Sequence, residues 1–208
     1  MKDISVKALA KINLGLDVVR KREDGYHEVR MVMQTIHLFD RLEISKNTSG
    51  EITMETNLSF LPTNENNLVY KAAKLLQDEF AIKDGVHVWL HKYIPVAAGM
   101  AGGSTDAAAV LYGMNQIFDL GLTREELMER GVKIGADVPY CIMRGTALAE
   151  GIGEKLSKLP PMVKCPVLIA KPQISVSTKF VYENLKLGSD MVHPDICLLS
   201  TSPSPRDI

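Results

Sequence analysis

A stretch rich in glycine and alanine has the residue types in this sequence that best fit a chemical task. Residues 95–105 contain three glycines and end in two hydroxyl residues, Ser104 and Thr105, where a helical pattern begins. Glycine has no Cβ, so backbone N–H groups can approach a ligand closely. The first turn of the following helix adds unpaired N–H donors and the positive end of its dipole. Such a loop binds phosphate, although a tight strand-to-helix turn has a similar composition.

No lysine follows the last glycine, which distinguishes this stretch from the common P-loop. The hydroxyls of Ser104 and Thr105 could contact phosphate oxygens or a magnesium ion, because both accept such partners. Ser104 is the candidate magnesium ligand. The residues expected to surround the phosphates are Pro95, Val96, Ala97, Ala98, Gly99, Met100, Ala101, Gly102, Gly103, Ser104 and Thr105.

Two charged residues far apart in the sequence are candidates for phosphoryl transfer. Lys11 lies inside an alternating apolar segment, where lysine is rare without a partner. It either faces solvent or neutralises charge that develops on a transferring phosphoryl group. Asp137 lies in a Gly/Pro-flanked turn at 135–139. It is either a local cap or a carboxylate that accepts a hydroxyl proton.

An aromatic residue beside an imidazole forms a third candidate site. Tyr26 and His27 end a polar loop that turns at Asp24-Gly25. Such a pair can stack on a base and hydrogen-bond its edge, or it can be ordinary packing.

Composition limits the class of protein. The chain has 208 residues, a hydrophobic content of 46% and a formal net charge of −1, so it can bury a core and has no general attraction to nucleic acid or anionic membranes. No run of 18 apolar residues and no signal peptide is present. The three cysteines are far apart, without metal-like spacing. We expect a soluble, reduced, cytoplasmic protein that has neither nucleic acid nor membrane as partner.

The elements that position these residues follow from periodicity and capping. Apolar residues alternate from Ile4 to Val18, which predicts one buried face of a strand with Lys7, Lys11, Asn13 and Asp17 on the other. Asn66-Asn67 can cap a helix. Further strands are expected at 29–37, 41–46, 51–56, 86–93, 140–149 and 166–171, and further helices to about 118 and over 123–133. Strands that precede the helices without regular alternation favour an α+β fold.

These segments together resemble the kinases of the GHMP superfamily, and within it the branch that acts on a cytidine diphosphate-linked methylerythritol. The resemblance covers about residues 4–196. Its motifs are the segments 10–14, 24–27, 95–105 and 135–139, supported by 147–154 and by Lys171, Pro172, Ser175 and Thr178.

The resemblance implies a two-subdomain fold that transfers the γ-phosphoryl of ATP, with Mg²⁺, to the 2-hydroxyl of the methylerythritol unit in isoprenoid synthesis. Asp137 is then the general base and Lys11 the adjacent cation. The loop at 95–105 wraps the ATP phosphates. The residues implied at the adenine are Asn66, Asn67, Leu68 and Lys92. Those implied at the cytidine-linked substrate, besides Asp137, are Asn13, Tyr26, His27, Thr178 and Tyr182, with Tyr26 and Tyr182 sandwiching the cytosine.

The resemblance also implies an ATP-binding subdomain over 1–155 and the start of a second subdomain over 156–196. Residues 197–208 form an atypical Ser/Pro-rich tail, either disordered or foreign to the family. Family members continue for about another third through a second glycine-rich segment. We therefore expect an incomplete second subdomain, poor solubility, and weak or absent activity. The alternatives are another kinase of the superfamily, acting on mevalonate, homoserine or a sugar, and an inactive nucleotide-binding fragment.

Overall fold

The computed structural model describes residues 3–172, 178–185, 187, 193, 194 and 196. The chain divides into two compact units: unit 1 contains residues 1–11 and 36–143, and unit 2 contains residues 12–35 and 144–208. Each unit is built from strands and helices, so the predicted α+β class is confirmed. Ser175 and the tail 197–208 lie outside the described residues.

The sheet of unit 1 uses parts of two long strands, β1 (Asp3–Lys21) and β2 (His27–Asn47), which are paired. Within this unit, β2 pairs antiparallel with β4 (Gly85–His91), over 41–47 and 85–91. Strand β3 (Ile52–Thr56) pairs with β4 in parallel. A parallel pair of strands needs a crossover connection, and here the chain from β3 to β4 contains one helix, residues 68–79.

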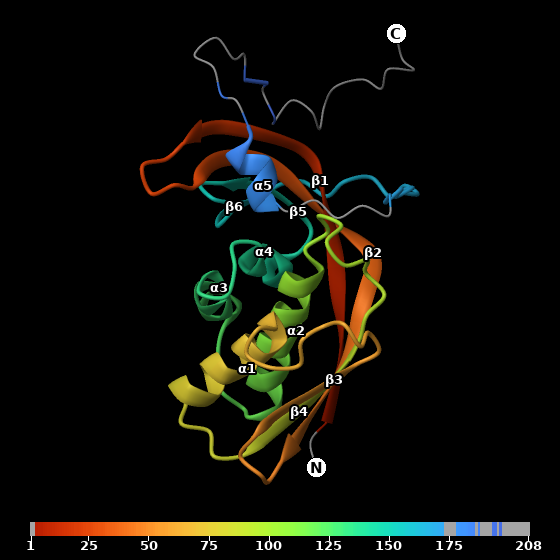
Figure 1. Ribbon diagram of the computed structural model, residues 1–208, viewed down its shortest axis with the longest axis vertical. Helices are drawn as coiled ribbons and strands as arrows, with labels where there is room; N and C mark the ends of the chain where they lie inside the picture. Colours follow the sequence, from red (N-terminus) through yellow and green to blue (C-terminus); the bar gives the residue numbers. More distant parts are fainter. Residues whose placement is uncertain (1–2, 173–177, 186, 188–192, 195, 197–208) are drawn as a thin grey trace. The chain divides into compact units, whose positions relative to one another are not determined.

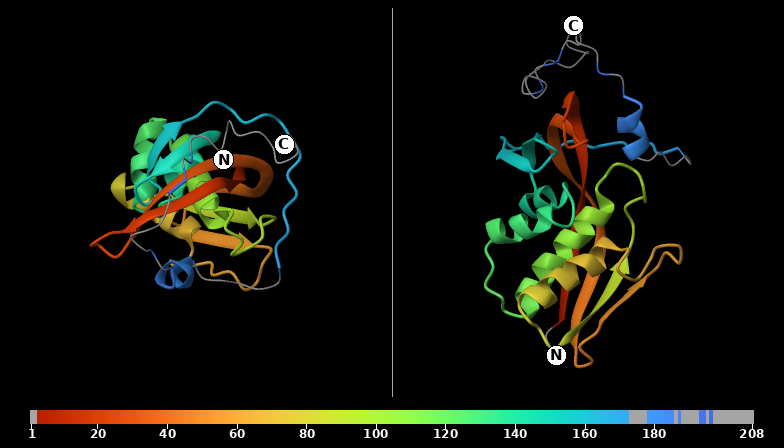
Figure 2. Two further views of the ribbon diagram at one scale, coloured as in Figure 1. Left: turned by 90° about the horizontal axis from the view of Figure 1, so that it is seen from above. Right: turned by 60° about the vertical axis from the view of Figure 1, so that its left-hand side comes forward.

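Helices cover one face of these strands, and α1 and α2 lie side by side there (Figures 1 and 2). The helix α1 (Leu68–Glu79) begins at the predicted cap, since Asn67 accepts a hydrogen bond from the backbone of Val69. The other helices of unit 1 are α2 (Gly102–Ile117), α3 (Arg124–Val132) and α4 (Val138–Met143). A capping box, Thr123 with Glu126, begins α3.

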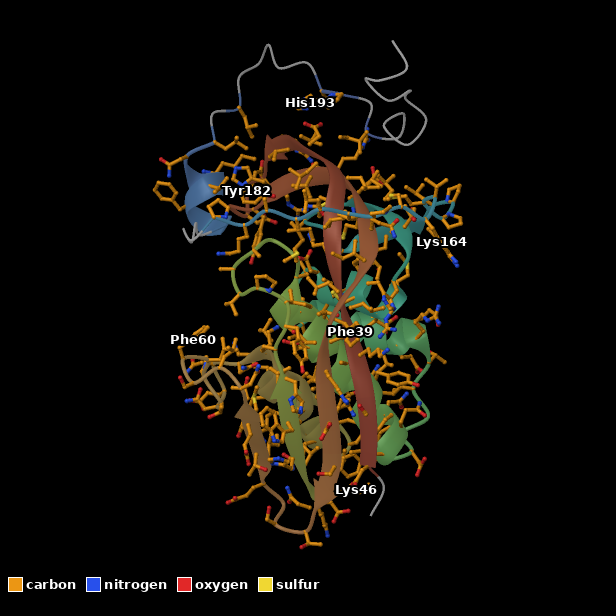
Figure 3. All side chains as sticks on the ribbon, turned by 90° about the vertical axis from the view of Figure 1, so that its right-hand side faces the viewer. Phe39, Lys46, Phe60, Lys164, Tyr182 and His193 are labelled. Carbon is orange, nitrogen blue, oxygen red and sulfur yellow. The ribbon has the colours of Figure 1, made fainter. Side chains whose placement is uncertain are left out.

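The core of unit 1 lies between α2 and the sheet. A Cβ on Gly113 of α2 would come within 2.4 Å of the Ile44 side chain on β2, so glycine is what permits this close approach. Leu42, Ile44 and Leu111 are buried in this layer. Phe39 lies on the opposite face of β2, where the Lys7 ammonium lies over its ring (Figure 3).

Unit 2 contains a smaller antiparallel sheet. Residues 31–34 of β2 pair with β5 (Thr146–Glu150), and β5 pairs with β6 (Lys155–Lys158). The predicted turn before Tyr26 is confirmed: Gly25 has φ +85° and the backbone of Tyr26 donates to the Asp24 carboxylate. The short helix α5 (Thr178–Glu183) carries Tyr182 (Figure 3).

Two strand predictions are wrong in a physically informative way: the first part of 140–149, of which 146–149 do lie in β5, and 166–171. Residues 138–143 form α4 rather than a strand, because Asp137 begins a helical turn by accepting the Cys141 N–H. Residues 166–171 have the composition of a strand but are exposed coil, with no strand pairing among the described residues. A strand needs a hydrogen-bonded neighbour, which residue type cannot supply. The ranges 29–37 and 41–46 are strand as predicted and are joined in one continuous strand, β2.

The predicted alternation of the first strand holds only in part. Val6, Ala8 and Ala10 are buried as expected. Beyond Ala10 the pattern fails: Lys11 is also buried, and Leu14 is 41% exposed. The change in burial occurs where β1 passes from unit 1 to unit 2. The two parts of the strand therefore have different neighbours.

Candidate active site

The loop before α2 has a backbone form that composition alone did not reveal. Ala97, Gly99 and Ala101 have φ of 53°, 70° and 55°, so every second residue is left-handed. Left-handed residues that alternate with residues of negative φ can turn successive N–H groups toward one side and form an anion-binding concavity. Alanine in this region costs about 1–2 kcal/mol per residue. The loop therefore contains two strained alanines, in addition to a glycine that adopts positive φ without strain.

The first turn of α2 supplies further donors. The first helical hydrogen bond runs from Thr105 N–H to Ala101 C=O. The N–H groups of Gly102, Gly103 and Ser104 precede it and have no helical acceptor. A Cβ on Gly103 would meet only the Leu68 side chain at 3.5 Å, so this part of the backbone is uncovered. The arrangement is suited to a phosphate chain at the positive end of a 16-residue helix.

The two predicted charged residues lie together in unit 1. The Lys11 Nζ atom is 3.8 Å from the Asp137 Oδ2 atom. Lys11 is buried, whereas the Asp137 side chain is 31% exposed and can meet a ligand. A separation of 3.8 Å is within ion-pair range but longer than an N–H···O hydrogen bond. The pair therefore combines an accessible carboxylate with a buried, charged neighbour.

Backbone contacts tie this pair to the loop. The Lys11 N–H donates to the Met100 carbonyl at 3.2 Å. The hydroxyl of Thr105 donates to the Leu9 carbonyl at 2.8 Å, so it fastens α2 to β1 from a buried position. Ser104 is half-buried in the first turn. Of the two hydroxyls, Ser104 is thus the better candidate for a metal or phosphate contact.

The residues expected around adenine fall into two groups. Asn66 is exposed, Asn67 caps α1, and Leu68 lies next to Gly103, all near the start of α1. Lys92 is different, because its side chain is only 4% exposed. Its ammonium contacts two carboxylates, Asp40 on β2 and Asp106 on α2, at 2.8 Å in the case of Asp106.

Asp40 and Asp106 were not predicted from the sequence. Burial raises the pKa of Asp106 to about 8, against the lowering effect of Lys92, and the nearby Asp40 carboxylate adds to the increase. The Oδ1 atom of Asp106 is buried and has no hydrogen-bond partner in the described part of the protein. A signal for both was present, since Asp40 lies on the same strand face as Leu42 and Ile44, and Asp106 directly precedes an apolar run in its helix.

Cys141 lies behind Asp137 in α4. Burial raises the pKa of its thiol far above the ordinary value, and the Asp137 carboxylate raises it further. A thiol that remains protonated is a poor nucleophile. Cys141 is therefore a packing residue.

The residues expected to bind cytidine belong to unit 2. The rings of His27 and Tyr182 are in contact, with centroids 5.0 Å apart. Tyr26 is 60% exposed. Asn13 is exposed on β1, and Thr178 begins α5. The cytosine sandwich by Tyr26 and Tyr182 stays a prediction.

No three His, Cys, Asp or Glu side chains gather as a metal centre among the described residues. Within the same part of the chain, no helix is long and apolar enough to cross a bilayer. A further contact that the sequence did not predict joins the His193 Nδ1 atom to the Asp17 carboxylate in unit 2, at 2.9 Å.

Comparisons with known proteins identify the class to which this loop and charged pair belong. A family model described as the GHMP kinases N terminal domain matches residues 67–145, a range that contains the loop, α2 and Asp137. A crystal structure of 4-(cytidine 5'-diphospho)-2C-methyl-D-erythritol kinase superposes with a TM-score of 0.75 at 34% identity, covering 88% of this chain and 65% of that one. A homoserine kinase from Cytophaga hutchinsonii has the same fold, with a TM-score of 0.68 at 18% identity over 92% of this chain and 62% of its own. The chain thus carries the N-terminal domain of a GHMP kinase.

Sequence relatives narrow the class. The chain is 62% identical to a 4-diphosphocytidyl-2-C-methyl-D-erythritol kinase of Lachnoclostridium phytofermentans, over 93% of this chain and 66% of the relative. It is 60% identical to the enzyme of that name from Lachnospira eligens, over 94% of this chain and 68% of the relative. The chain therefore belongs to the 4-diphosphocytidyl-2-C-methyl-D-erythritol kinase family. It spans about two thirds of the length of these relatives.

Proposed function

We propose that this chain transfers the γ-phosphoryl group of ATP to the 2-hydroxyl of 4-diphosphocytidyl-2-C-methyl-D-erythritol, a step in isoprenoid synthesis. The observation that carries the proposal is the Lys11–Asp137 pair, 3.8 Å apart and hydrogen-bonded through the Lys11 backbone to the phosphate loop. Family membership supports the choice of acceptor. In this proposal the Lys11–Asp137 pair contacts the 2-hydroxyl group of the acceptor.

In this mechanism the acceptor hydroxyl gives its proton to Asp137 while the hydroxyl oxygen forms a bond to the γ-phosphorus of ATP. The bond from that phosphorus to the β-phosphate oxygen breaks, and ADP leaves. The buried Lys11 ammonium lies beside the Asp137 carboxylate and stabilises negative charge on the attacking oxygen. The N–H groups of the loop and of the first turn of α2 bind the phosphates. Positioning and electrostatics supply most of the catalysis in such reactions.

A magnesium ion fits this proposal as a companion of the nucleotide. Mg²⁺ is usually held by a few protein oxygens together with substrate phosphates. Ser104 offers one hydroxyl in the first turn of α2. When bound, the ion neutralises charge on the β- and γ-phosphates.

The acceptor specificity is assigned to unit 2, where Tyr26, His27 and Tyr182 would bind the cytosine ring, with Asn13 and Thr178 nearby. Aromatic stacking provides contact area, and hydrogen bonds to the base edge select the base. A reduced, cytoplasmic setting completes the proposal, consistent with Cys141 and Cys165 being free thiols.

The test compares acceptors and one matched pair of variants. With MgATP, turnover of the 208-residue chain is expected to be weak and to occur with the cytidine diphosphate-linked acceptor but not with mevalonate or homoserine. Asp137→Asn should lower turnover by about 10²–10⁴ while MgATP affinity changes little, because the carboxylate serves the acceptor. Asp78→Asn, at an exposed carboxylate of α1, is the control and should leave turnover unchanged.

Two outcomes would redirect the proposal. A near wild-type rate for Asp137→Asn removes this carboxylate from the mechanism. MgATP binding by calorimetry without product for any acceptor favours the remaining alternative, a nucleotide-binding fragment without catalysis.

A further inference from the structure

The two ends of the phosphate loop are joined by one buried charge cluster. At the entry of the loop, the Asp40 Oδ1 atom accepts the backbone N–H groups of Tyr93 and Ile94, at 2.5 and 2.8 Å. The other oxygen of Asp40 accepts from the Lys92 ammonium. That ammonium also donates to Asp106, in the second turn of α2 beyond the loop exit, at 2.8 Å.

The cluster lies directly behind the backbone of the first helical turn. A Cβ on Gly102 would be 3.1 Å from the Lys92 Nζ atom. Asn57 holds the backbone of Lys92 on both sides, accepting its N–H at 2.8 Å and donating to its carbonyl at 3.1 Å. Asp40 is fully buried and Asp106 is 2% exposed. Burial of this depth strengthens each charged contact and makes its loss costly.

We propose that Asp40, Lys92 and Asp106 form a buried, hydrogen-bonded clamp that fixes both ends of the loop at 95–105, so that Lys92 is a positioning residue for the loop rather than a contact to adenine. This inference rests on the proposed ATP site and specifies how that site is held. The clamp supplies what the strained loop requires, because left-handed alanines persist only where their surroundings fix them. It also holds a cation beneath the donors that face the phosphates.

The experiment measures phosphate and adenine recognition separately in the full chain. MgATP and adenosine are titrated by calorimetry into wild type, Lys92→Met, Asp106→Ala and Asp106→Asn. Lys92→Met and Asp106→Ala should weaken MgATP binding about tenfold and leave adenosine binding within about twofold, because a loosened loop loses only the phosphate contacts. Asp106→Asn keeps an oxygen acceptor for Lys92 and should remain within about threefold of wild type.

A second readout needs no nucleotide. Hydrogen–deuterium exchange at the amides of 96–105 should accelerate in Lys92→Met and Asp106→Ala, while exchange in α3 stays at the wild-type rate. Glu79→Gln is the matched control: it breaks the ion pair of Glu79 with Arg130, which joins α1 to α3, and should leave the loop amides unchanged.

The other possible outcomes decide whether the clamp or the proposed function is wrong. Equal loss of MgATP and adenosine affinity in Lys92→Met would overturn the clamp in favour of a direct adenine contact. Unchanged loop exchange, or faster exchange throughout unit 1, would also overturn it. If wild type binds no MgATP but the loop amides respond as expected, the clamp stands and the proposed function fails alone.

Discussion

The loop at 95–105 in unit 1 and the segment 163–169 of unit 2 are both irregular, yet they differ in what holds them. The ends of this loop are held by the buried cluster of Asp40, Lys92 and Asp106. The loop belongs to the unit whose core contains the fully buried Leu111. In the other segment Val163 is 80% exposed and Leu168 is 97% exposed. Irregular backbone becomes a binding device only when packing and charge fix it from behind. Apolar sequence without a paired neighbour remains open surface.

The largest expected difference compares the same substitution in the two units. Leu111→Ala should lower the free energy of unfolding by about 2–5 kcal/mol, because it leaves a cavity in a packed core. Leu168→Ala should change it by less than about 0.5 kcal/mol, because that side chain already lies in solvent. Urea unfolding of both variants measures the two values. A large loss for Leu168→Ala would show that unit 2 is packed around this segment after all.

Next in size is the pH dependence that comes from the clamp. The pKa of Asp106 is near 4 in the unfolded chain and about 8 in the folded one. The folded state therefore binds more protons between these values, and stability falls as pH rises from about 4 through 8, then levels off above the folded pKa. The charged or titratable groups near Asp106 are Lys92, Asp40 and Cys141.

Asp106→Asn tests this sign, because the amide does not titrate. Chemical unfolding at several pH values should give a flatter dependence in the variant than in wild type. An identical slope in both proteins would mean that Asp106 is not the group responsible. No titration of unit 2 is needed to explain the expected slope.

The smallest effect concerns strain within the loop. Ala101→Gly should leave stability within about 0.5 kcal/mol of wild type or raise it, because relief of the left-handed alanine offsets the greater freedom of glycine in the unfolded chain. Ala107→Gly is the same change at a right-handed position in α2 and should cost about 1 kcal/mol. Thermal unfolding separates the two. Equal losses would mean that Ala101 is not strained.

Local signals predicted much of unit 1. The Asn67 cap, the helix that begins after Thr123, and the strand-to-loop-to-helix order around 95–105 follow from residue types close together in sequence. The glycine content also pointed to the loop at 95–105 as a candidate site. It did not reveal that Ala97 and Ala101 adopt left-handed backbone, because such conformations are imposed by contacts outside the loop.

The remaining features of the fold and the candidate site depend on contacts between segments that are distant in the sequence. The sequence by itself determined the α+β class, the helix caps and the candidate residues Lys11 and Asp137. Only the tertiary structure brought those two to 3.8 Å, turned 138–143 into a helix, left 166–171 without a strand partner, and buried Lys92 between two unforeseen carboxylates. Helix caps depend on neighbours within a few residues, whereas strand pairing and buried ion pairs depend on which distant segments meet.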